Sequence, residues 1–158
     1  MEQTPSRRFA PARAPLILVV SYWERILAGE TNLKKILDSM SPKLIDGEYV
    51  FCTAQSAKYG DYAEARPIAT FNEEEGLTLV LLKKSAEELG LSYEGLFRCI
   101  TLTVHSSIET VGLTAAVSSK LSEHGISANV VAAYYHDHVF VPSRFAEKAL
   151  SVLLEFSS

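Results

Sequence analysis

The stretch Leu96–Val141, LFRCITLTVHSSIETVGLTAAVSSKLSEHGISANVVAAYYHDHVFV, decides the fold because its hydrophobic period changes three times. Phe97–Val104 alternates apolar and polar residues, as a half-buried strand does. From Gly112 the apolar residues recur with a helical period. Gly125 is predicted to end this helix, because many helices end at a glycine. Ile126–Tyr135 predicts a second strand, which a hairpin joins to a third. The predicted order is strand, helix, hairpin.

Three short motifs mark the ends of these elements. Ser106-Ser107-Ile108-Glu109 matches the capping-box pattern that precedes a helix. His136-Asp137-His138 is predicted as the hairpin turn, because aspartate favours turns. The closing helix is predicted over Pro142–Glu155, with the proline in its first turn.

The preceding half of the chain gives weaker signals. Thr31–Met40 predicts a short helix that Thr31 or Asn32 can cap and that Pro42 stops. Gly47–Thr53 is rich in aromatic and β-branched residues and predicts a strand. Ala54–Arg66 has no firm period, so we interpret it as a loop or a degenerate helix.

A hairpin and a short helix follow in this half. Pro67–Phe71 and Leu77–Leu82 predict two strands joined by the charged turn Asn72–Gly76. Ser85 opens a second capping-box pattern, and Gly90 ends the helix that it predicts.

The two halves repeat the same order of elements. Leu79–Leu81 lies sixty residues before Val139–Val141, and the same offset relates Ala86-Glu87 to Ala146-Glu147. Each half begins with a strand that contains a cysteine. Two β-α-β-β-α units predict an α+β fold of two tandem ferredoxin-like units, with antiparallel sheets covered by helices on one face.

Composition narrows the class of protein. The chain has 158 residues, 47% hydrophobic content and a net charge of −4. With a pI near 5.6 and no basic cluster, we expect no binding to nucleic acid, which requires concentrated positive charge. Cys52 and Cys99 lie in strand-like runs without metal-ligand spacing, so buried reduced thiols and a cytoplasmic location are expected.

Residues 1–30 differ in character from the rest. Three arginines precede the apolar run Pro15–Val20, as in a signal peptide, but no cleavage site follows and the run is too short to span a membrane. We expect a poorly ordered N-terminal extension and no membrane association.

The motifs YVFCT, PIATFNEEEGLTLVL, FRCITLTVHSS, VGLTAAVSSKL, GISANVVAAYYHDHVFV and AEKAL together resemble bacterial proteins built from two tandem ACT-like domains. The resemblance runs from about Leu33 to the C-terminus. It implies a first unit over residues 31–95, with a degenerate first helix, and a second over residues 96–158. It also implies a regulatory module that binds small molecules, commonly amino acids, and that pairs with another copy as a homodimer.

The strand-to-helix loop of the second half is the candidate site. A helix start presents unpaired N–H groups that suit a carboxylate, Gly112 allows close approach, and Ser106, Thr114 and Asn129 offer polar groups. The ACT resemblance places the ligand between this loop and the second strand. The expected ligand-binding residues are His105, Ser106, Val111, Gly112, Leu113, Thr114, Ala128, Asn129 and Val130. Alternatively, these polar residues serve only as caps and local hydrogen-bond partners.

Two other functions compete with ligand sensing. His105, His136 and His138 could hold a metal ion as a metal-dependent enzyme would, but no further spaced ligand accompanies them. No paired nucleophile and base, P-loop or dinucleotide fingerprint is present. The sequence therefore predicts a non-catalytic protein without cofactor or metal. A pure protein-interaction module is the alternative to ligand sensing.

Overall fold

The computed structural model describes residues 30–104 and 110–158 of the chain. The expected N-terminal extension lies outside these residues, apart from Glu30. Among the described helices, none has the length and apolar character that crossing a membrane requires.

The elements of the first half begin and end close to the predicted positions, except for the strand Pro42–Leu44, which the sequence analysis did not predict. They are α2 (Leu33–Asp38), β1 (Pro42–Leu44), β2 (Tyr49–Ala54), the 3-10 turn η1 (Ala63–Ala65), β3 (Ala69–Glu73), β4 (Gly76–Leu82) and α3 (Lys83–Glu88). Asn32 caps α2 as predicted, because its side chain accepts a hydrogen bond from the Lys35 N–H.

The second half contains a full crossover helix between its first two strands. Its elements are β5 (Phe97–Leu102), α4 (Leu113–Glu123), β6 (Asn129–Val131), β7 (Asp137–Pro142), η2 (Ser143–Phe145), α5 (Ala146–Leu154) and η3 (Glu155–Ser157). The repeat of strand, hairpin and helix is confirmed, and so is the α+β fold of two ferredoxin-like units.

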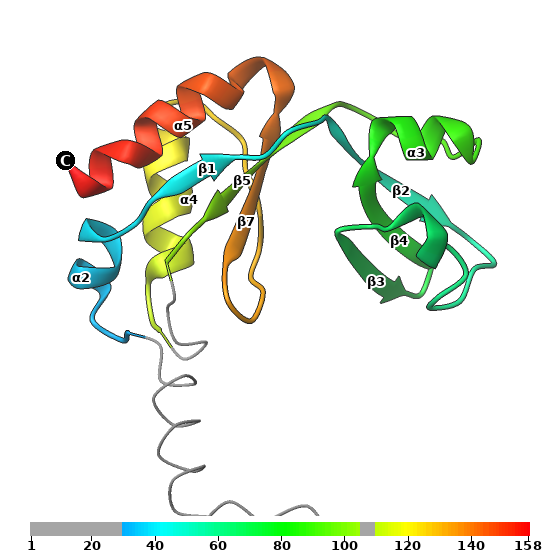
Figure 1. Cartoon of the computed structure of the whole chain (residues 1–158), viewed down its shortest axis with the longest axis horizontal. Coiled ribbons are helices and arrows are strands. Elements are labelled where there is room, and N and C mark those ends of the chain that lie inside the picture. Colours follow the sequence, from blue (N-terminus) through cyan, green and yellow to red (C-terminus); the bar gives the residue numbers. More distant parts are fainter. Residues whose placement is uncertain (1–29, 105–109) are drawn as a thin grey trace, which may run out of the picture.

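The described strands form one antiparallel sheet, in the order β3-β4-β2-β5-β7-β6, with β1 paired to β5. The two halves meet where β2 and β5 pair at Tyr49 and Phe97. Figure 1 shows α3 and β2–β4 in one lobe, and the other helices with β1, β5 and β7 in the second.

α2 and β1 pack with the second half, although residues 31–95 were predicted to form the first unit. β1 pairs with β5, with Pro42 opposite Leu102, and Ile36 and Met40 of the α2 stripe are buried in the same core as Ile100. A strand from the N-terminal half thus joins the part of the sheet that β5, β7 and β6 form. The residue boundaries proposed for the two units stay a prediction.

The described helices α2, α3, α4 and α5 cover one face of the sheet. On that face Ile100 and Val139 pack under α2, α4 and α5, whereas Val50 and Leu81 pack in the first lobe with Ala86 of α3. On the opposite face, Tyr49, Phe51 and Phe97 cluster around Phe140 with edge-to-face ring contacts. We call this helix-free side the open face.

The predicted hairpin turn in the second half is wrong in position. The turn falls before His136, β7 begins at Asp137, and His138 lies inside the strand opposite Thr101. Pairing with β5 sets this register. The preceding strand is correspondingly shorter than predicted, covering only Asn129–Val131.

Two helix starts also differ from prediction. α3 begins at Lys83 rather than at a cap formed by Ser85, because the Lys83 N–H is already bonded to the Glu48 carbonyl of the neighbouring strand segment. Pro142 ends β7, and α5 begins after the short turn η2. The predicted capping box at Ser106–Glu109 lies outside the described residues.

Candidate functional site

The start of α4 forms the described part of the predicted site. Gly112 occupies the N-cap position with φ 101° and ψ −10°, a conformation that glycine adopts without strain, and it has no side chain that could cap the helix. The first helical bond runs from the Ala116 N–H to the Gly112 carbonyl. The N–H groups of Leu113 and the next two residues therefore have no partner within the helix.

The N-terminal segment lies against this loop. A Cβ on Gly112 would come within 3.0 Å of the Leu33 Cδ2 atom of α2. The Thr110 hydroxyl donates a hydrogen bond to the Glu30 carbonyl at 3.1 Å. What approaches Gly112 closely is therefore a leucine side chain of this chain, and a ligand must reach the helix start from another side.

The predicted residues of the loop differ in exposure. Val111 is 88% exposed and Thr114 is also exposed, so both are accessible to a ligand. Leu113 is 4% exposed and packs in the core, so only its backbone can contribute. His105 and Ser106 lie outside the described residues.

Ala128, Asn129 and Val130 lie at the start of β6. Asn129 pairs with Phe140 and therefore faces the open side of the sheet, whereas Val130 pairs with Val139 and packs toward the helices. Since α4 has 11 residues, about 16 Å separates its ends, and β6 follows the C-terminal one. The structure does not bring Asn129 together with the start of α4, and these three residues stay a prediction.

His138 lies on the open face beside Thr101 and Cys99. The Thr101 Oγ1 and His138 Nδ1 atoms are 2.9 Å apart, and the Cys99 Sγ atom is 3.9 Å from the same nitrogen. Burial lowers the pKa of His138, an effect to which the charge of His136 adds, and burial raises the pKa of Cys99 to about 11. A protonated, fully buried thiol is a poor nucleophile.

The alternative metal site is only partly described. Within residues 30–104 and 110–158, no group of three or more histidine, cysteine, aspartate or glutamate residues could hold an ion. His105, the third ligand of that hypothesis, lies outside these ranges. Cys52 and Cys99 are buried and unpaired by a disulfide, as predicted.

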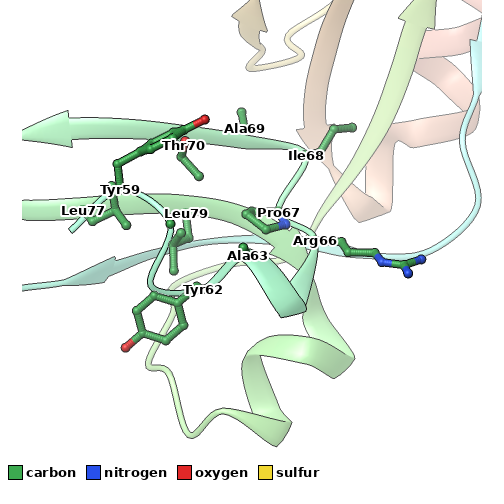
Figure 2. A pocket seen from close by; sticks show the side chains of 11 residues that line it. Tyr59, Tyr62, Ala63, Arg66, Pro67, Ile68, Ala69, Thr70, Leu77 and Leu79 are labelled. Carbon is green, nitrogen blue, oxygen red and sulfur yellow. The ribbon is translucent and has the colours of Figure 1, made fainter. Parts of the chain in front are cut away.

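A cavity that the sequence analysis missed lies beside β3 in the first lobe (Figure 2). It has a volume of about 480 Å³, with Leu77 and Leu79 of β4 and Thr70 of β3 among its lining residues. Tyr59 and Arg66, from the connection between β2 and β3, line it from the other side. The sequence contained only an indirect indication of this cavity. The connection between β2 and β3 lacks a helical period, although the repeat requires a crossover helix there.

Comparison with known protein families gives a separate match for each half of the chain. Profiles of the ACT domain match residues 28–98 and, separately, residues 96–155. No curated protein matches the sequence.

Solved structures share the fold. A protein of unknown function from Vibrio cholerae, VC0802, described as a possible transport protein, is 56% identical, with a TM-score of 0.73 over 81% of this chain and 98% of that one. Protein Atu0741 from Agrobacterium tumefaciens is 21% identical, covering 75% and 89% of the two chains, with a TM-score of 0.62. The regulatory subunit of aspartate kinase from Thermus thermophilus is 13% identical, covering 75% and 98%, with a TM-score of 0.54.

Proposed function

Because this chain belongs to the family of proteins with tandem ACT domains, we propose that it is a non-catalytic regulatory protein that binds an amino acid at the loop before α4. ACT domains are typically regulatory modules that bind amino acids. The aspartate kinase subunit with the same fold is a regulatory subunit, which supports the class of function and not a particular ligand.

The N-terminus of α4, whose N-cap residue Gly112 offers no capping side chain, carries this proposal. Unpaired backbone N–H groups and the positive end of the helix dipole attract a carboxylate, and every amino acid has one. Gly112 supplies no side chain that could fill this position, and the exposed Thr114 adds a hydroxyl group.

A counter-charge for an ammonium group lies on the neighbouring segment. Glu30 is joined to the loop through its carbonyl, which accepts the hydrogen bond from Thr110. Its carboxylate accepts hydrogen bonds from the Asn32 and Thr31 N–H groups and pairs with the Lys35 ammonium group at 3.6 Å, and these contacts keep the pKa of Glu30 low and the group ionised. A ligand ammonium group would share this carboxylate with Lys35. An amino acid would thus find groups of both signs near this helix start. His105 and Ser106 stay in the proposed site as predictions.

A thermal-shift screen of the full chain against the amino acids tests the proposal. A ligand that binds only the native state adds about 2.7 kcal/mol at a hundredfold excess over Kd. For a chain of this size, this raises Tm by roughly 5–10 °C.

The decisive variant is Thr114→Asp, which places a carboxylate in the first turn of α4. We expect it to keep or raise the basal Tm through the helix dipole and to abolish the ligand-induced shift by competing with the ligand carboxylate. Ser119→Asp makes the same charge change on an exposed part of α4 away from its start and should keep the shift. A flat screen, or equal loss in both variants, contradicts the proposal.

We also propose that the protein is a homodimer through its open face, where Phe71 and Leu82 are 43% and 42% exposed. A dimer of this kind with no response to any amino acid would support the interaction-module alternative instead.

A cytoplasmic location remains part of the proposal, and the two buried free thiols support it.

A further inference from the structure

The two units differ most at the crossover between their first two strands. In the second unit α4 makes this crossover with 11 residues, and Val117 and Leu121 pack it onto the sheet. In the first unit the corresponding connection between β2 and β3 contains only the three-residue turn η1. The cavity of about 480 Å³ beside β3 lies where this connection runs (Figure 2).

The lining of this cavity is apolar at its base and polar around it. Leu77 and Leu79 are 1% and 0% exposed and belong to the core of the first lobe. Thr70 and Tyr59 contribute hydroxyl groups, and Tyr59 is 82% exposed. A volume of this size lies within the range of about 300–1,000 Å³ that small-molecule sites occupy.

Arg66 is the one charged residue in this lining. No acidic residue lines the cavity, and across the described part of the chain Arg66 takes part in none of the ion pairs. In Figure 2 its side chain extends outward from the rim, away from Leu77 and Leu79. A long exposed side chain of this kind can rotate toward an anion at the cavity mouth.

The backbone of Arg66 is strained. With φ 50° and ψ 56° it adopts the left-handed conformation, and it is the one non-glycine residue with positive φ among the described residues. Glycine or asparagine would occupy this position at lower energy. Strain retained at a cavity rim, on a charge without a partner, indicates that the guanidinium group serves a ligand.

We propose that this cavity is a second ligand site, distinct from the loop before α4, for a small organic carboxylate with an apolar body. The carboxylate pairs with the Arg66 guanidinium at the mouth, and the apolar body packs on Leu77 and Leu79. Tyr59 covers the body from the exposed side. The site exists because the first unit replaces a crossover helix with a short turn.

Protein-observed NMR titrations of the full chain test this site with phenylacetate and hexanoate. Their neutral amides, phenylacetamide and hexanamide, are the controls for charge. We expect at least one carboxylate, at millimolar concentration, to move the backbone signals of Gly60, Ala63 and Thr70. The matched amide should bind about fivefold or more weakly, because a hydrogen bond to a charged group is stronger than a neutral one.

Arg66→Gln should remove the preference for the carboxylate over the amide. Arg66→Gly should do the same with an unchanged or higher Tm, because glycine accepts the left-handed backbone, so a loss of binding cannot be attributed to unfolding. Arg144→Gln, at an exposed arginine of the second unit, should leave binding unchanged.

Three results would overturn the proposal. In the first, none of the probes moves signals in the segment from Tyr59 to Thr70. In the second, the carboxylate preference persists in Arg66→Gln. In the third, the shifts map instead to Val111–Thr114, which would support the amino-acid site before α4 and reject a second site. Failure of the α4 site leaves the titration at Arg66 unaffected, so the two proposals fail separately.

Discussion

Replacement of Gly112 by alanine tests how the start of α4 is built. The residue has φ 101° and ψ −10°, outside the region that residues with a Cβ normally occupy. The new methyl group would lie 3.0 Å from the Leu33 Cδ2 atom, which is closer than ordinary van der Waals contact. The substitution therefore combines backbone strain with a local clash.

The expected loss of stability follows from three contributions. The strained conformation costs about 1–2 kcal/mol in the folded state. The reduced freedom of the unfolded chain offsets about 0.5–1 kcal/mol of this. Displacing the end of the Leu33 side chain adds about 0.5–1 kcal/mol, as an off-rotamer side chain does. The net loss is about 1–2 kcal/mol, which for this chain length corresponds to a Tm decrease of roughly 2–8 °C.

Urea denaturation followed by circular dichroism measures this loss, and Gly125→Ala is the matched control. Gly125 also has positive φ, at 69°, but no atom lies within 4 Å of its would-be Cβ. It should lose only the part due to backbone strain. A double-mutant cycle between Gly112→Ala and Leu33→Ala should then show a coupling of about 0.5 kcal/mol or more.

The reasoning is refuted if Gly112→Ala is as stable as the wild type, or if the cycle with Leu33 shows no coupling. The first result would mean that the loop relaxes to accept a side chain. The second would mean that α2 does not pack on the start of α4.

Three further predictions concern a cap, the thiols and pH. Asn32→Ala removes the hydrogen bond that its side chain accepts from the Lys35 N–H, and denaturation should show a loss of about 1 kcal/mol that Asn32→Ser largely restores. Burial raises the pKa of both Cys52 and Cys99, so a disulfide reagent should modify them only after unfolding, and rapid modification of the folded chain would contradict this. Burial holds the folded-state pKa of His138 below 6.5, so the unfolded chain binds its proton first as the pH falls. Stability should therefore decrease as the pH drops from about 6.5 through the folded-state pKa, and His138→Gln should flatten this part of the pH dependence; an unchanged slope would contradict it.

The sequence predicted the elements whose signals are local. The helical period after Gly112, the cap at Asn32 and the strand predicted over Phe97–Val104 each depend on neighbouring residues, and the structure confirms all three elements. The strand covers Phe97–Leu102, however, and the prediction that it is half-buried is wrong, because Cys99 and Ile100, on its two faces, are both fully buried. Local signals failed where pairing between distant strands decides the outcome. Hydrogen bonding to β5 places His138 within a strand rather than in a turn.

The candidate sites divide in the same way. A helix start at Gly112 could be predicted from the sequence, because helix starts are encoded within a few residues. That Asn129 faces the open side required the register of the assembled sheet. The cavity beside Arg66 could not be predicted from the sequence, because it depends on the absence of a helix over β3, which only the assembled structure shows.

By itself, therefore, the sequence determined the α+β class, the tandem repeat and the position of one helix start, because periodicity and caps act over a few residues. Only the tertiary structure decided that Pro42–Leu44 forms a strand beside β5 and that a cavity replaces a helix in the first unit. A strand of three residues has almost no local preference of its own. Its hydrogen bonds to β5, far along the chain, determine its conformation.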